Sequence, residues 1–205
     1  MKKLLPIIAL SMGLLFVPIT SNAQSSNATL AETMEWIQTY VERYGNIICD
    51  TSEACVLDAY KKVKFDYDED GNCTYSYVAK HKEDKEVKHI QYVTYTFNLS
   101  DIVEVSNSKA NGNFIWWNDC CKDKHFYTIH FKTFLQREVI KENTITKIYY
   151  YDKDEEEFYL AETSVDEIGH ASMFLYLTEQ GVSARMVRAF KHGVNLFGGM
   201  KKEKF

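Results

Sequence analysis

The sequence predicts an α+β fold in which a curved antiparallel sheet, or a pleckstrin-homology-like barrel, has a helix at each end of the chain. Apolar residues recur at three- and four-residue spacing near residue 30 and near the C-terminus, which is typical of amphipathic helices. Between these segments apolar and polar residues alternate, which is typical of half-buried strands. No proline follows Pro18, so no proline-rich linker divides the chain. We expect seven to nine strands in one domain over residues 24–205.

The first 23 residues have the features of a secretory signal peptide. Lys2 and Lys3 precede an apolar run, and Ser21-Asn22-Ala23 has the small residues of a cleavage site. The run is short for a membrane span, and two prolines interrupt it. We therefore expect cleavage near Ala23, export to the periplasm or the cell exterior, and no stable membrane insertion.

The charge balance argues against nucleic acid as a partner. The chain has 24 lysine and arginine residues against 29 acidic ones, a formal net charge of −5. The basic residues form no run within the body of the chain, and the basic tail over residues 201–204 is interpreted as a solvated end.

The first helix is predicted over residues 29–45. Thr29 and Glu32 have the spacing of a capping box, and Gly45 stands where helices commonly end. Between them the apolar positions fall on one helical face: Leu30, Met34, Ile37, Val41 and Tyr44.

The middle of the chain is predicted to consist of strands. Residues 63–67 and 73–77 alternate around an Asp70-Gly71 turn, which is typical of a β-hairpin. Segment 106–113 is predicted to be a polar loop, and the acidic segment 152–157 the tip of a hairpin. Further strands are predicted over residues 93–99, 102–105, 114–117, 125–133, 144–151, 158–161 and 172–177.

A second helix is predicted to begin at a Ser183 cap and to end at Gly198-Gly199. Its apolar face is expected to pack on the sheet as a structural lid. The residues of that face are Met186, Val187, Phe190, Val194 and Phe197.

The five cysteines leave one thiol that is free or paired between chains. Cys49 and Cys55 could close a small loop. A bridge from Cys120 or Cys121 to Cys73 is easier to accept than a strained bond between neighbours, but the connectivity stays open.

Three segments resemble a family of small exported bacterial domains of unknown function. They are Thr33–Ile37 (TMEWI), Leu99–Ile102 (LSDI) and Ala184–Gly193 (ARMVRAFKHG). In that family a pleckstrin-homology-like barrel ends in a helix, and Gly193 here replaces a residue that is usually apolar. The resemblance implies the same barrel and no catalytic residues.

Asp66, Asp68 and Asp70 match the first half of an EF-hand calcium loop. Tyr77 stands where the bidentate glutamate belongs, and the flanking residues have the pattern of strands. We therefore favour an acidic hairpin turn and keep the three aspartates as weak calcium candidates.

Cys121, His125 and His130 are ligand types that zinc accepts. However, residues five apart on a strand face opposite sides of the sheet, and exported cysteines tend to be oxidised. The three are therefore weak zinc candidates. A catalytic Cys–His pair lacks an orienting third group.

Trp116 and Trp117 are the candidate binding residues. Neighbours on a strand face opposite ways, so one of them could stack on a sugar ring or anchor a partner protein. Packing under the C-terminal helix or a sheet edge is the competing interpretation, and we favour it.

These observations favour an exported, non-catalytic domain without a cofactor. It would bind a protein, peptide or glycan through a sheet edge or an aromatic patch. The alternatives are a periplasmic hydrolase with no recognisable motif and a barrel that carries a metal or ligand, because hydrolase sites often assemble only in three dimensions.

Overall fold

The computed structural model describes residues 28–47, 57–82, 86–111 and 125–199. Two helices and eight strands make up these residues, with single 3-10 turns at Leu99–Asp101 and Phe134–Gln136. In chain order the elements are α1 (Leu30–Tyr44), β1 (Leu57–Tyr67), β2 (Asn72–Lys82), β3 (Val87–Asn98), β4 (Ile102–Asn111), β5 (His125–Thr133), β6 (Ile140–Asp152), β7 (Glu157–His170), β8 (Ser172–Leu177) and α2 (Gln180–Leu196).

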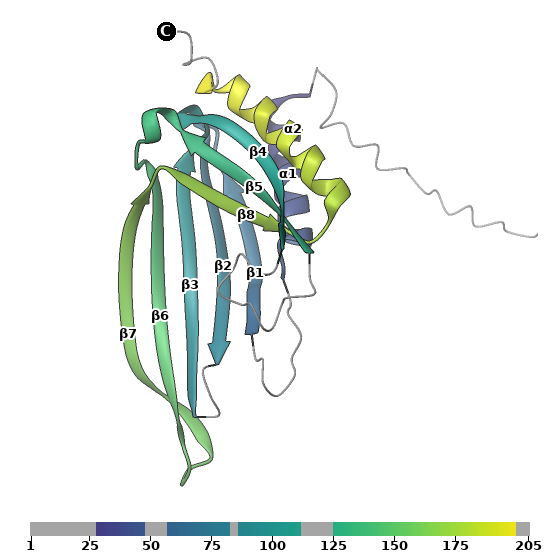
Figure 1. The fold of residues 1–205 in the computed structure, drawn as a ribbon. Helices are drawn as coiled ribbons and strands as arrows, with labels where there is room; N and C mark the ends of the chain where they lie inside the picture. The colour runs from purple at the N-terminus through teal and green to yellow at the C-terminus, as the bar shows by residue number, and fades with distance from the viewer. Residues whose placement is uncertain (1–27, 48–56, 83–85, 112–124, 200–205) are drawn as a thin grey trace, which may run out of the picture.

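The strands form two antiparallel sheets, in the orders β1-β2-β3-β6-β7 and β4-β5-β8. The smaller sheet crosses one end of the larger sheet, and the two helices lie together on the β1 side (Figure 1). The predicted α+β class, the antiparallel strands and the two helices are confirmed. The described residues form no closed barrel, because β1 and β7 end the larger sheet at opposite edges.

Both helices form where the sequence places them, with one difference at the start of α2. Thr29 and Glu32 make the predicted capping box of α1. Ser183, in contrast, does not cap α2, which begins at Gln180. Its buried hydroxyl donates to the carbonyl oxygen of Gln180 (3.0 Å) and accepts from Asn107 Nδ2 (3.2 Å). This serine therefore fastens α2 to β4.

The predicted loop over residues 106–113 is wrong where the structure describes it, because β4 continues to Asn111. Ser106 pairs with His130 in β5, and the pairing runs on to Asn111. Polar side chains are compatible with a strand whose backbone is paired, and Ser108 Oγ lies 2.7 Å from Thr128 Oγ1. The predicted strand over residues 114–117 lies outside the described residues.

The hydrophobic core lies between the two sheets and α2. Phe131 of the smaller sheet contacts Phe97 of the larger sheet (ring centroids 5.6 Å apart) and Phe190 of α2 (4.7 Å, edge to face). Phe190 also meets the Phe65 ring edge-on at 5.7 Å. All these aromatic residues are buried, so the predicted role of Phe190 at the centre of the lid is confirmed.

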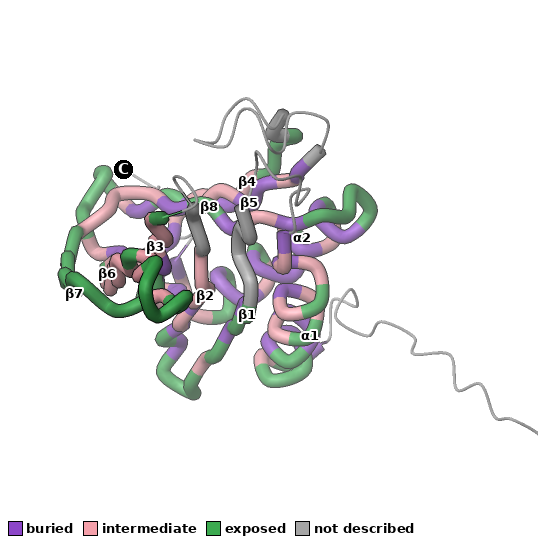
Figure 2. Tube along the Cα trace, turned by 90° about the horizontal axis from the view of Figure 1, so that it is seen from below, coloured by how far each residue is buried: buried purple, intermediate pink, exposed green. Residues whose placement is uncertain are grey.

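Burial decreases steadily across the larger sheet. One register row runs from β1 to β7 through Phe65, Tyr75, Tyr95, Glu142 and Ile168. The face that carries this row is called the inner face here, and the opposite one the outer face. Phe65 and Tyr75 are fully buried, the next two residues are partly buried, and Ile168 is 50% exposed. The core therefore occupies the β1 side of the sheet (Figure 2).

Cys73 is a free thiol inside this core, so a bridge from Cys73 to Cys120 or Cys121 is not present. Its Sγ lies 3.7 Å from the carbonyl oxygen of Gly71, and burial raises the pKa of the thiol. The other four cysteines lie outside the described residues. No described helix is long and apolar enough to cross a membrane.

Candidate functional site

Five of the sequence candidates either lie outside the described residues or lie apart from each other in β5. Trp116, Trp117 and Cys121 are outside the described residues. His125 opens β5 and His130 lies in the same strand, which pairs with β4 without a register shift between these positions. The two histidine positions therefore belong to opposite faces, as the sequence predicted.

The aspartates of the predicted calcium motif form hydrogen bonds with different parts of the structure and do not converge on one point. Asp68 Oδ1 accepts from the backbone N–H groups of Asp70 (3.0 Å) and Asn72 (2.9 Å), and Oδ2 accepts from Asn72 Nδ2 (2.9 Å). These hydrogen bonds, the one from the Asn72 side chain foremost, lower the pKa of Asp68. Asp66 instead accepts from Gln38 of α1 (3.2 Å). Within the described residues no three potential metal ligands gather.

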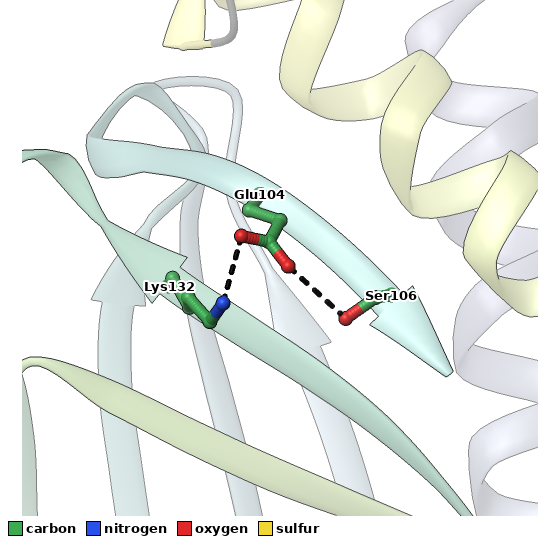
Figure 3. Close-up of polar contacts among 3 residues, drawn as sticks. All are labelled: Glu104, Ser106 and Lys132. Atoms are coloured by element: carbon green, nitrogen blue, oxygen red, sulfur yellow. Dashed lines mark hydrogen bonds and ion pairs between the residues drawn. The ribbon is translucent and has the colours of Figure 1, made fainter. Parts of the chain in front are cut away.

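Polar side chains cross between β4 and β5 on the smaller sheet. Lys132 Nζ lies 2.8 Å from Glu104 Oε2, and Ser106 Oγ lies 3.4 Å from Glu104 Oε1 (Figure 3). The hydrogen bond from Lys132 lowers the pKa of Glu104. His130 stacks on Phe174 (4.4 Å), and burial lowers the pKa of its imidazole. These contacts hold neighbouring strands together, and the half-exposed Glu104–Lys132 pair stabilises the fold only weakly.

A carboxylate and an imidazole meet on the inner face beside β7. His170 Nε2 lies 2.8 Å from Glu142 Oε2, and Thr144 Oγ1 donates to Glu142 Oε1 (2.9 Å). A nucleophile–histidine–acid triad needs the histidine in the middle, so that it can take the proton of the hydroxyl. Here the carboxylate is in the middle, so Thr144 is not activated by His170. The pair instead connects the end of β7 to β6.

A small cavity lies at the end of the molecule where β5 turns into β6. Its volume of about 230 Å³ is below the range of about 300–1,000 Å³ that is usual for small-molecule pockets. The lining residues are Asp101, Thr133, Phe134, Arg137 and Val139. The cavity is therefore too small to be the main candidate site.

The outer edge of β7 is the most distinctive surface of the described structure. β7 is 14 residues long and pairs with β6 alone. In an antiparallel edge strand about half of the backbone N–H and C=O groups point away from the neighbour. No described strand pairs with these outward groups, so β7 presents a long row of free hydrogen-bonding groups.

Apolar side chains are concentrated on this strand. The described residues include nine large hydrophobic side chains that are exposed, and four of them are on β7. The most exposed of the four is Val165, at 63%. Figure 2 shows β7 exposed along almost its whole length. The four residues are Tyr159, Leu160, Val165 and Ile168.

Val165 also ends an apolar row on the outer face. In register, Val78 lies opposite Tyr92, Tyr92 opposite Ile145, and Ile145 opposite Val165. Directly opposite side chains on one face of a sheet contact each other and stabilise the pairing. A strand added beyond β7 would extend this row by one more apolar residue.

The sequence indicated only a small part of this edge. It predicted a strand over residues 158–161, whereas β7 runs to His170. The segment from Glu162 to Gly169 places Val165 and Ile168 three residues apart, which does not match the two-residue period of a strand. One signal for a longer β7 was available in the sequence. The strand predicted over residues 144–151 is twice as long as the one predicted over 158–161, and a long strand usually pairs with a neighbour of similar length.

Comparison with known proteins identifies no relative of this chain. No family model, curated protein or solved structure matches the chain. The functional assignment therefore depends on the geometry of the β7 edge.

Proposed function

We propose that this chain is an exported, non-catalytic binding module that takes up an extended segment of a partner protein along β7. The observation that carries the proposal is the edge itself: 14 residues long, paired on one side only, with four exposed apolar side chains. Long, apolar edges of this kind add further strands readily, and proteins usually shield them.

Binding by strand addition uses two sets of contacts. The backbone of the incoming segment would bond to the outward N–H and C=O groups of β7, which supplies affinity for any extended chain. Its alternate side chains would then meet Val165 on the outer face and Ile168 on the inner face, which supplies selectivity. The pairing with β6 and the Glu142–His170 contact hold β7 extended before binding, so little order has to be gained.

Two further observations support the remaining parts of the proposal. The proposal of export is supported by the order of charged, apolar and small residues in residues 1–23. A non-catalytic role agrees with the Glu142–His170 pair, in which Thr144 donates to the carboxylate and not to the imidazole. A hydrolase of the serine, threonine or cysteine type would need a nucleophile aligned with that imidazole.

Selection from a random peptide library tests the binding role. The selected peptides should protect β7 amides from hydrogen exchange, and Val165→Lys should weaken binding by at least about tenfold, because a lysine on an edge strand opposes strand addition. Leu196→Lys is the matched control, since it replaces an exposed apolar residue on α2, and its affinity should equal that of the parent. Protection confined to other strands, or parental affinity of Val165→Lys, would exclude β7 as the site.

N-terminal sequencing tests the export. The protein recovered outside the cytoplasm should begin at or near Gln24. An intact Met1 on membrane-bound protein would contradict the proposal.

A further inference from the structure

The β7 edge is strongly acidic. The strand carries four acidic side chains and no lysine or arginine. All four are exposed, and none of them forms an ion pair with another described residue. The four residues are Glu157, Glu162, Asp166 and Glu167.

The register assigns these charges to the two faces of the sheet. Asp166 lies opposite Thr144 on the inner face, and Glu162 lies on the same face four residues away. Glu167 is on the outer face with Val165. An incoming strand therefore meets carboxylates on both faces and an apolar side chain beside them.

We infer that the segment bound along β7 is a basic one, an extended strand in which lysine or arginine residues accompany apolar residues. This inference depends on the proposed binding function and identifies the chemistry of its partner. Opposite charges that face each other across neighbouring strands stabilise the pairing, and like charges destabilise it. Basic residues opposite Glu162 and Asp166, with an apolar residue opposite Val165, satisfy both faces at once.

The same charges argue against a second copy of this chain as the occupant. Two β7 strands paired with each other would bring the four carboxylates of each copy together without any cation. The β1 strand of a second copy is basic at Lys62 and Lys64 but has two register shifts. Lys62 also has a left-handed backbone (φ 56°), so β1 cannot supply a continuous ladder. Neither edge strand of the larger sheet therefore fits β7 in a second copy, which favours a different chain as the partner.

Three synthetic peptides of about ten residues, the length of a long strand, test this inference on the full chain. Each alternates valine with one other residue, which is lysine, threonine or glutamate. Calorimetry should give a Kd for the lysine peptide at least about tenfold below that of the threonine peptide, and the glutamate peptide should bind weakest. The preference should shrink as salt is added, because these charges are exposed.

A variant and its control locate the effect. Glu162→Gln/Asp166→Asn/Glu167→Gln should bring the lysine and threonine peptides within about twofold of each other, since the cross-strand charge pairs are gone. Glu35→Gln/Glu42→Gln/Glu69→Gln removes as many charges away from β7 and should leave the preference unchanged. Circular dichroism checks that both variants fold, and the salt dependence of the parent gives a second readout.

The outcomes separate the two proposals. If all three peptides bind equally and protect β7 amides, the charge inference is wrong and the binding function stands. If no peptide protects β7, the binding function fails as well. A parent chain that sediments as a dimer, and is dissociated by the lysine peptide, would identify a second copy as the occupant and overturn the inference.

Discussion

The two edge strands of the larger sheet meet their surroundings in opposite ways. Phe65 on β1 and Ile168 on β7 end the same register row on the same face. Phe65 packs against Phe190 of α2 and is fully buried, whereas half of the Ile168 surface is exposed. Two residues at the ends of one register row can therefore differ completely in burial. Their burial depends on the helices, which cover only the β1 side of the sheet.

The β1 edge also has the features that proteins use to block strand addition. Its pairing with β2 shifts register twice, and Lys62 and Lys64 are exposed on it. α1 packs along it, with the Tyr67 hydroxyl 3.5 Å from the carbonyl oxygen of Ala31. β7 shifts register against β6 only once, between Ile148 and Tyr149, and it has no lysine and no described cover. The clearest difference is therefore the cover: α1 lies along β1, and no described element lies along β7.

The largest expected effect is on stability. Phe65→Ala should lower the free energy of unfolding by about 3–5 kcal/mol, through lost burial and the cavity left behind. Ile168→Ala, on the same row, should cost at most about 1 kcal/mol, because half of its surface is already in water. Urea unfolding of both variants measures the difference. Equal losses would mean that β7 belongs to the core and is not a free edge.

The second effect concerns self-association. Neutralising Glu162, Asp166 and Glu167 to amides should strengthen pairing between copies by at least about tenfold, since like charges no longer oppose each other across two β7 strands. Lys62→Gln/Lys64→Gln should leave the sedimenting mass unchanged, because the register shifts of β1 remain. Analytical ultracentrifugation over a range of concentrations provides the test. If only the Lys62→Gln/Lys64→Gln variant formed dimers, β1 and not β7 would be the edge that is able to pair.

Hydrogen exchange should distinguish the two edges in the unmodified protein. The amides of residues 157–168 in β7 should exchange at least about tenfold faster than those of residues 63–67 in β1, because β7 opens locally without disturbing the core. Mass spectrometry of peptic fragments measures both segments in one experiment. Slower exchange in β7 would show that this strand is covered in solution.

The smallest effect is at the turn that joins β1 to β2. The pKa of Asp68 is held below its ordinary value of 3.8 by the Asn72 side chain and the turn amides. The stabilisation that the ionised Asp68 carboxylate gives to the turn is therefore complete above pH 3.8. It is lost as the pH falls through the lower pKa of the folded protein. An NMR titration should show the Asp70 and Asn72 amide signals shifting in acid, and Asp68→Ala should abolish the shift. Unchanged signals in the parent would contradict the hydrogen bonds.

Local structure was predictable wherever neighbours in sequence decide it. The α1 capping box of Thr29 and Glu32 was predicted because both partners lie within one helical turn. The turn at Gly71, whose φ is +80°, was predicted because few other residues adopt that conformation. Ser183 was misjudged because its hydroxyl bonds to Asn107, 76 residues away, and no sequence pattern shows such a contact.

The sequence by itself determined the α+β class, the antiparallel strands and the apolar face of α2, because periodicity reports which side of an element avoids water. Only the tertiary structure decided that the strands divide into two sheets and that the helices cover β1 and not β7. The physical reason is that covering a strand depends on where distant elements pack. Val165 and Ile168 are residue types that are usually buried in a core, and they lie on an exposed edge because nothing described packs over them.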